Sequence, residues 1–119
     1  MSIDKNYYVI AGYDLTDYKT CKYENWKWTD AGEAYVCNQR SGKVQLFDDP
    51  VSGSHLYLGF IFAAGDQWYF ETEKFDMIDF QNAFEDVCRA LEHLIRVGVV
   101  SIDTQHLPKY QIIAFEECS

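Results

Sequence analysis

The segment DMIDFQNAFEDVCRALEHLIRVG, from Asp76 to Gly98, carries the strongest structural signal in this chain of 119 residues. Its apolar side chains recur at spacings of three and four residues, which is the period of one buried face of an α-helix. Asp76 is a good N-cap, and Gly98 is a natural residue just past a helix C-terminus. We therefore expect one amphipathic helix that runs from Met77 to Val97.

The apolar stripe of this predicted helix defines a core-facing side. Phe84 and Leu91 lie in the middle of the stripe, so we expect them to be core anchors, whereas Asn82 falls on the opposite, polar face. The full stripe consists of Met77, Phe80, Phe84, Val87, Leu91 and Leu94, widened by Cys88 and Ile95.

The segments on either side of this helix have the composition of β-strands. Leu56–Ala64 is short and continuously apolar, which is typical of a central strand. Gly65-Asp66 suits a two-residue hairpin turn into a strand over 67–72 that pairs with Leu56–Ala64. Further strands are expected within Asn6–Asp14, Ala34–Cys37, Val44–Phe47 and Tyr110–Phe115.

The segment from Thr16 to Thr29 is mixed in character. Trp26 and Trp28 flank Lys27 at strand spacing, so both rings would point to one side of a strand. The alternative is a long ordered loop. Together the elements predict a single domain over residues 1–119 with an α+β fold: an antiparallel β-sheet of about five strands with one long amphipathic helix packed on one face.

The charge of the chain narrows its range of partners. The formal net charge is −9, and 17% of the residues are aromatic. Residues 61–119 hold eleven acidic and four basic side chains, so most of the negative charge lies in that half. We expect no direct nucleic-acid binding, because that needs a basic surface, and no membrane binding for the same reason. A basic surface on another protein is the favoured partner, although acidity that only maintains solubility remains the alternative.

Sequence motifs for catalysis are absent. The chain has no nucleophile elbow, zinc-protease motif, phosphate loop or calcium loop, and its four cysteines match no zinc spacing. The N-terminal residues lack the pattern of a signal peptide, so we expect free thiols and a cytoplasmic location. No cofactor and no metal site are predicted.

The candidate binding residues form two groups. Eight acidic and two basic residues between Asp66 and Glu92 give that stretch a net charge of −6. This acidic stretch predicts a partner-binding surface at Glu71, Glu73, Asp79, Asp86 and Glu92. An alternative ligand site would stack nucleobases on aromatic rings and hold phosphates with nearby cations. Its residues would be Lys19, Lys22, Trp26, Lys27 and Trp28.

Five stretches of the sequence carry a resemblance to known proteins: Ala11–Leu15, Lys22–Trp28, Gln45–Pro50, Ser52–Tyr57 and Ile113–Cys118. These stretches resemble small proteins encoded by phages and prophages of Gram-positive bacteria. This resemblance implies an accessory protein in the host cytoplasm, such as a counter-defence factor of the anti-CRISPR kind that inhibits a nucleic-acid-binding enzyme. It carries no catalytic residues over to this chain.

Three functions therefore follow from the sequence. The leading one is a non-enzymatic accessory protein that binds a basic surface of a host protein. The second is a small-molecule or nucleotide-binding module, a sponge that uses aromatic residues. The third is a small hydrolase or metal enzyme that depends on carboxylates.

Overall fold

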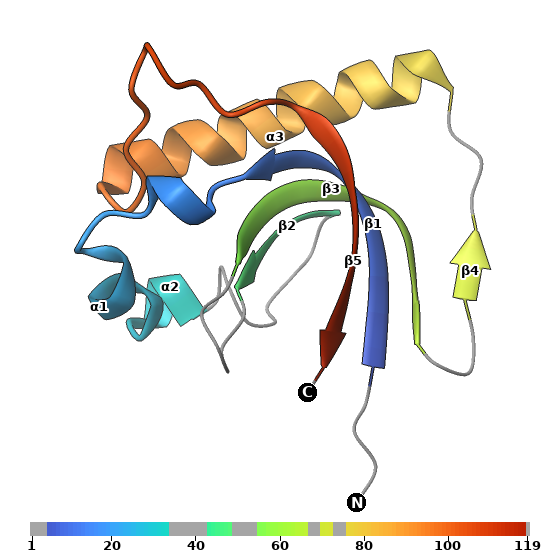
Figure 1. Ribbon diagram of the computed structural model, residues 1–119, viewed down its shortest axis with the longest axis horizontal. Coiled ribbons are helices and arrows are strands. Elements are labelled where there is room, and N and C mark those ends of the chain that lie inside the picture. The colour runs from blue at the N-terminus through green and yellow to red at the C-terminus, as the bar shows by residue number, and fades with distance from the viewer. Residues whose placement is uncertain (1–4, 34–42, 49–54, 67–69, 73–75, 119) are drawn as a thin grey trace, which may run out of the picture.

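The computed structural model describes residues 5–33, 43–48, 55–66, 70–72 and 76–118, which form one antiparallel sheet and one long helix (Figure 1). The strands are β1 (Lys5–Asp14), β2 (Val44–Asp48), β3 (Leu56–Asp66), β4 (Phe70–Thr72) and β5 (Gln111–Cys118). The helical elements are the 3₁₀ turn η1 (Thr16–Tyr18), α1 (Tyr23–Lys27), α2 (Asp30–Glu33) and α3 (Met77–Val97).

Strand order in the sheet is β2-β3-β1-β5, and every pair is antiparallel. The three-residue β4 pairs with the far end of β3, beyond the stretch that pairs with β2. The predicted α+β architecture is confirmed. The predicted count of about five strands is close but not exact, because four strands form the continuous path and β4 is only a short addition at the end of β3.

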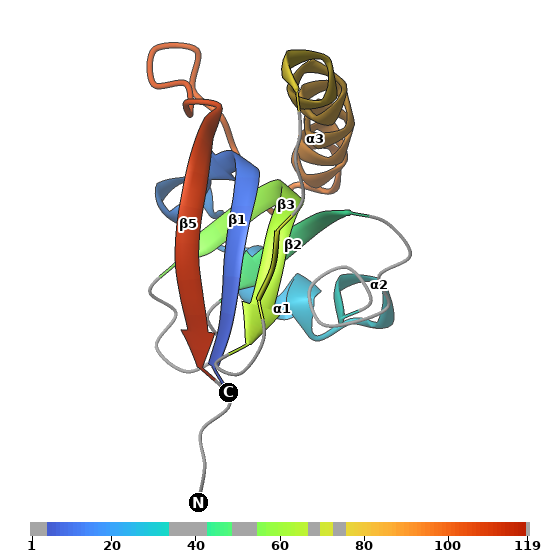
Figure 2. The same ribbon diagram turned by 90° about the vertical axis from the view of Figure 1, so that its right-hand side faces the viewer.

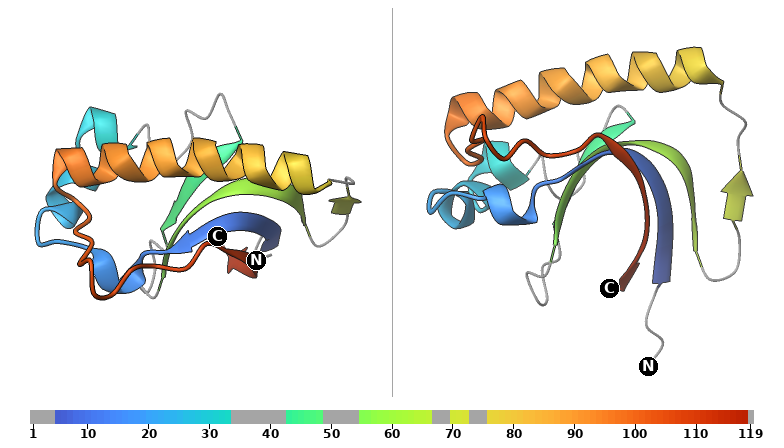
Figure 3. Two further views of the ribbon diagram at one scale, coloured as in Figure 1. Left: turned by 90° about the horizontal axis from the view of Figure 1, so that it is seen from above. Right: turned by 45° about the horizontal axis from the view of Figure 1, so that its top comes forward.

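The sheet curves strongly, and α3 lies across its convex side (Figures 1 and 3). A β-bulge contributes to this curvature: Val9 of β1 pairs with Ala63 and Ile10 pairs with Ile61, so Phe62 is an extra residue in β3. Bulges bend the strand that carries them and increase its twist. The concave side of the sheet faces away from α3.

The prediction of a hairpin turn at Gly65-Asp66 is wrong. Both residues belong to β3, where Gly65 pairs with Tyr7 of β1 on one side and with Phe70 of β4 on the other. Glycine and aspartate favour turns, but backbone hydrogen bonding to two neighbouring strands outweighs that local preference. The antiparallel pairing of this segment with β3, which the sequence also predicted, is present over Phe70–Thr72.

The bounds of α3 agree with the prediction, and both ends are capped. The Asp76 carboxylate accepts the backbone N–H of Asp79 at 3.0 Å, and the Asp79 carboxylate accepts the backbone N–H of Asp76 at 3.0 Å. This reciprocal capping box satisfies two donors that an open helix end would leave unpaired. Gly98 ends the helix in the left-handed region at φ 85°. No helix in the described ranges has the length and apolarity needed to cross a membrane.

The core lies between α3 and the convex side of the sheet. Val87 and Leu94 are completely buried and pack in one cluster with Leu46 of β2 and Leu58 of β3. Phe84, predicted as a core anchor, is 40% exposed, so that prediction is wrong. The buried line of the helix runs instead through small Ala83, Val87 and Leu94. Hydrophobic periodicity located the apolar half of the helix but not its centre, because a buried alanine adds little to the pattern.

The segment around Trp26 and Trp28 is neither a strand nor a long loop. Residues 23–27 form α1 and residues 30–33 form α2. Tyr23 and Trp26 lie three residues apart, which places both rings on the side of α1 that meets the core, 5.9 Å apart. Trp28 follows the helix and is 75% exposed. The predicted strand at Ala34–Cys37 lies outside the described residues.

The depth of burial along α3 predicts which truncations destabilise the fold. We expect Leu94→Ala to lower the free energy of unfolding by about 2–5 kcal/mol, because it leaves a cavity in the core. Asn82→Ala, on the solvent side of the same helix, should change it by less than about 0.5 kcal/mol. Urea denaturation of the two variants measures both values, and equal losses would show that the helix packs with a different face.

The capping box predicts a pH dependence. The hydrogen bond from the backbone N–H of Asp79 lowers the pKa of the Asp76 carboxyl below its ordinary value. A lowered pKa in the folded state stabilises the fold above the unfolded-state pKa, and this contribution is lost as the pH falls through the folded-state pKa. Asp76→Asn keeps an acceptor oxygen without the charge.

Asp76→Asn should therefore melt at a lower temperature than the wild type at neutral pH, and the difference should vanish in acid. Circular dichroism melts of both proteins across the acidic range measure this. Asp17→Asn, at an exposed acid in η1, is the matched control. A difference in melting temperature that is independent of pH would contradict the charged cap.

Candidate functional site

The solvent side of α3 carries the acidic residues that the sequence predicted for partner binding. Asp79, Asp86 and Glu92 are all exposed there. Glu71 belongs to β4, but its side chain and the whole of Glu73 lie outside what the structure describes, so their grouping with the helix stays a prediction. We call the following set the outer face of α3: Ile78, Asn82, Glu85, Asp86, Arg89 and Glu92.

Charges on the outer face of α3 are mixed. Arg89 lies 3.5 Å from Asp86 and 4.0 Å from Glu85. Pairs between exposed side chains contribute little to stability, since water and salt screen them. Arg89 therefore offsets part of the acidity in the middle of the helix. The Asp79 carboxylate already accepts the backbone N–H of Asp76 in the capping box, so it has a structural role in the helix.

Ile78 is a feature of the outer face that the sequence analysis missed. Its side chain is 65% exposed at the start of α3, among polar neighbours. The sequence could have placed Ile78 on this face, because it lies four residues before Asn82 and seven before Glu85. These spacings put all three residues on the polar side of the helix. Protein interfaces have an apolar centre within a polar rim, and single exposed apolar residues are also ordinary on protein surfaces without such a role.

The predicted cluster of lysines and tryptophans gathers around α1. The Nζ atoms of Lys19 and Lys27 lie 5.7 and 5.8 Å from the centre of the Tyr23 ring. Lys27 Nζ also lies 5.4 Å from the Trp28 ring, whereas Trp26 packs against the core. The two tryptophan rings therefore do not form one stacking surface. Lys22 is exposed just before α1.

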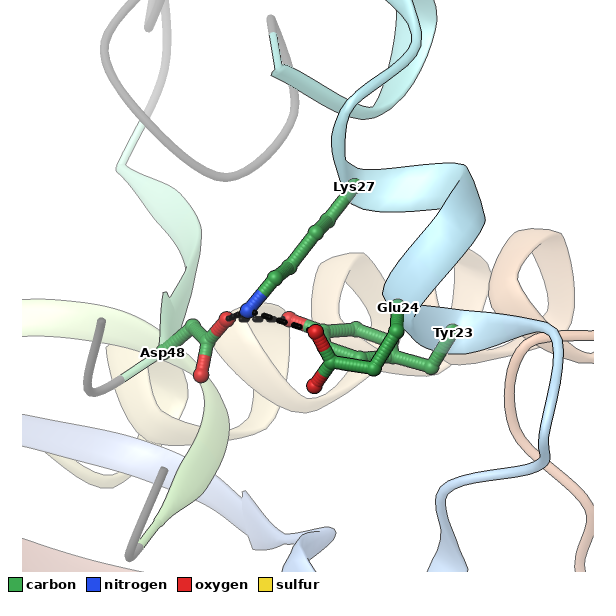
Figure 4. A network of polar contacts seen from close by, with 4 residues as sticks. All are labelled: Tyr23, Glu24, Lys27 and Asp48. Carbon is green, nitrogen blue, oxygen red and sulfur yellow. Dashed lines mark hydrogen bonds and ion pairs between the residues drawn. The ribbon is translucent and has the colours of Figure 1, made fainter. Parts of the chain in front are cut away.

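Lys27 takes part in a polar network that links α1 to the end of β2 (Figure 4). Its Nζ lies 3.3 Å from Asp48 Oδ2 and 3.1 Å from Glu24 Oε2, and the Tyr23 hydroxyl donates to Asp48 Oδ2 at 3.0 Å. The Asp48 side chain is only 4% exposed. Burial alone would lower the pKa of Lys27, but its hydrogen bonds to Glu24 and Asp48 outweigh burial, so the pKa is raised. The ammonium is thus already engaged by two carboxylates, which makes it a poor phosphate ligand.

Aromatic rings from four segments meet on the concave side of the sheet. Phe115 of β5 lies 4.9–5.7 Å, centre to centre, from four rings of neighbouring segments. The His55 and Tyr57 rings stack in parallel at 4.5 Å. We call this set the concave aromatic cluster: Tyr8, Phe47, His55, Tyr57 and Phe115. Phe47 is buried and the other four are half-buried.

A second set of titratable groups lies between α3 and the sheet. The Tyr13 hydroxyl lies 3.7 Å from Cys88 Sγ, and the Tyr110 hydroxyl donates to the Phe80 carbonyl. Burial, followed by the nearby Cys88 thiol, raises the pKa of Tyr110 to about 12 and raises that of Tyr13 as well. Both phenols therefore stay neutral and structural at ordinary pH. Cys21 and Cys88 are free thiols.

Within the described residues, no three His, Cys, Asp or Glu side chains come together as a metal-ion site requires. Comparison with protein-family models, with curated proteins and with solved structures returned no match to this chain. The function of the candidate sites must therefore be argued from their chemistry alone.

The buried network at Asp48 gives a stability prediction. Asp48→Asn removes the charge that faces Lys27 in a site with little water, so we expect a loss of about 1–3 kcal/mol in the free energy of unfolding. Glu24→Gln removes the solvent-exposed partner of the same lysine and should cost less than about 1 kcal/mol. Chemical denaturation measures both. A double-mutant cycle with Lys27→Met should show coupling for Asp48, and additive effects would contradict the network.

Proposed function

We propose that this chain is a non-enzymatic binding protein that docks the outer face of α3 on a basic surface of another protein. The observation that supports this best is the combination of three exposed carboxylates, Glu85, Asp86 and Glu92, with the exposed apolar side chain of Ile78 on one solvent-facing helix. Acidic side chains attract and orient a basic partner, and an apolar side chain among them adds contact area that excludes water.

The distribution of charge favours this surface over others. Residues 61–119, which include α3, hold most of the chain's negative charge. A field of one sign increases the rate at which an oppositely charged partner is captured. The resemblance to phage accessory proteins suggests the most concrete form of this proposal: an inhibitor that occupies the basic groove of a host nucleic-acid-binding enzyme, as a counter-defence factor would.

A second candidate function, the binding of a planar small molecule, is favoured by the concave aromatic cluster. Its half-buried rings at Tyr8, Tyr57 and Phe115 could stack on a flat ligand. This replaces the tryptophans of α1 as the aromatic surface of the nucleotide-binding alternative. A thermal-shift screen of nucleobases and nucleotides tests it, and a ligand that stabilises the wild type but not Tyr57→Leu would support it.

The carboxylate-dependent enzyme has no observation in its favour. Asp48 is the one buried acidic residue among the described parts of the chain, and its carboxylate is already engaged by Lys27 and Tyr23. A general base or nucleophile needs a carboxylate that can reach a substrate.

Charge reversal on α3 tests the proposed docking surface. A partner is first captured from lysate of a Gram-positive bacterium and identified, and its binding is then measured by surface plasmon resonance. We expect Asp86→Lys/Glu92→Lys to lower the association rate constant about tenfold or more at low salt, with a smaller effect in high salt, because steering by exposed charges is screened. Asp79 is left unchanged because it caps the helix.

The control is Asp17→Lys/Asp30→Lys, which changes the net charge equally at exposed acids far from α3 in the sequence. Ile78→Ala should act mainly on the dissociation rate constant, since it removes contact area rather than charge. If the α3 variant and the control bind at the same rate as the wild type, the outer face of α3 is not the docking surface.

A further inference from the structure

Strand β5 forms one border of the sheet, with β1 on its inner side (Figure 2). Among the residues that the structure describes, β5 pairs with β1 and with no second strand. The outer edge of a border strand presents backbone N–H and C=O groups that can extend the sheet with another strand. The edge of β5 is thus a candidate interaction surface.

Several features that commonly protect such an edge are missing from the first five residues of β5, Gln111–Phe115, which carry no charge, proline or glycine. The register of β5 with β1 also runs without a bulge from Gln111 to Cys118. Ile112 is 54% exposed, and Gln111 and Ala114 are exposed as well. A long, regular border strand with exposed apolar side chains favours pairing with a further strand.

The order of charges along this segment selects the direction of pairing. Lys109 precedes β5, whereas Glu116 and Glu117 lie at its end. Parallel pairing with the same segment of a second copy would place the acidic ends side by side. Antiparallel pairing places the basic end of each copy beside the acidic end of the other, so the segment is complementary to itself.

The two faces of the sheet select the register. A two-fold axis perpendicular to the sheet joins the α3 side of one copy to the α3 side of the other. Side chains that lie opposite one another then point to the same side of the sheet. Because side chains alternate between the two sides, the numbers of two such residues must differ by an even number. Lys109 lies two residues before β5, and it comes level with Glu117 of the other copy only when Ile113 lies on the axis. Ile112 then lies opposite Ala114 of the other copy on the α3 side, where it loses its exposure to water.

We propose that β5 pairs antiparallel with β5 of a second copy of this chain, about a two-fold axis at Ile113, so that one sheet continues through both copies. The edge position, the unbroken register, the exposed Ile112 and the self-complementary charges all support this arrangement. The pairing leaves the outer face of α3 free, and it stands independently of the proposed function.

Sedimentation equilibrium on the purified chain, with no other protein present, tests the pairing. We expect a monomer–dimer equilibrium in the wild type. Lys109→Glu should raise the dimer dissociation constant about threefold to thirtyfold, since two symmetric contacts each lose an attraction. Lys109→Glu/Glu117→Lys should restore the wild-type constant to within about threefold. Lys22→Glu, an equal charge change at α1, should leave it unchanged, and circular dichroism verifies the fold of each variant.

A cysteine scan tests the register. Opposite residues in an antiparallel pair have Cα atoms about 4.5–5.5 Å apart, which a disulfide can span. On oxidation, Ile113→Cys should therefore form more cross-linked dimer than the unmodified chain does. Gln111→Cys, two residues from the axis, should form no more than the unmodified chain. A wild type that stays monomeric at its highest soluble concentration overturns the proposal. So does a dimer that Ile113→Cys fails to cross-link or that Lys109→Glu leaves unchanged.

Discussion

Strand β3 is the element on which the rest of this fold depends, because it pairs with β1 along one side and with both β2 and β4 along the other. Its pairing with β1 requires very close approach at two glycines that face each other, Gly12 of β1 and Gly59 of β3. A Cβ atom on Gly12 of β1 would collide with the Leu58 carbonyl, and a Cβ atom on Gly59 would lie 2.7 Å from Ile10 Cδ1. The bend at Phe62 then gives the sheet a convex side for α3 and a concave side for the aromatic cluster.

Because the sheet has a convex and a concave side, the candidate interaction surfaces lie on different parts of the molecule. The apolar side of α3 is used to close the core, so its outer face is left to carry charge and the side chain of Ile78. The edge of β5 lies at the border of the sheet rather than on α3 (Figure 2). One copy could therefore engage another protein through α3 while its sheet is extended through β5. In the lysine and tryptophan cluster of α1, by contrast, Trp26 packs against the core and Lys27 is engaged by Asp48.

The sequence predicted those features that depend on neighbouring residues. The helix α3 was located because its caps, Asp76 and Gly98, and its apolar period are all local. The assignment of Phe84 to the core failed because the centre of a helix face is set by the partner surface. Gly65 was placed in a turn because its two strand neighbours, Tyr7 and Phe70, are not visible from local composition. The concave aromatic cluster needed the register of four separate strands, which no local pattern contains.

The pairing of β1 with β5 has a consequence for how the chain acquires its structure. Lys5 lies opposite Cys118, so the first described strand meets its second neighbour only after residues 111–118 have been made. Contacts between such distant positions carry a large loop-closure entropy and slow the folding of small domains. On the ribosome, β1 can form its pairs with β3 early, but it must remain at a border of the nascent sheet until residues 111–118 emerge. Completion of the sheet therefore waits for the synthesis of β5, the last strand that the structure describes.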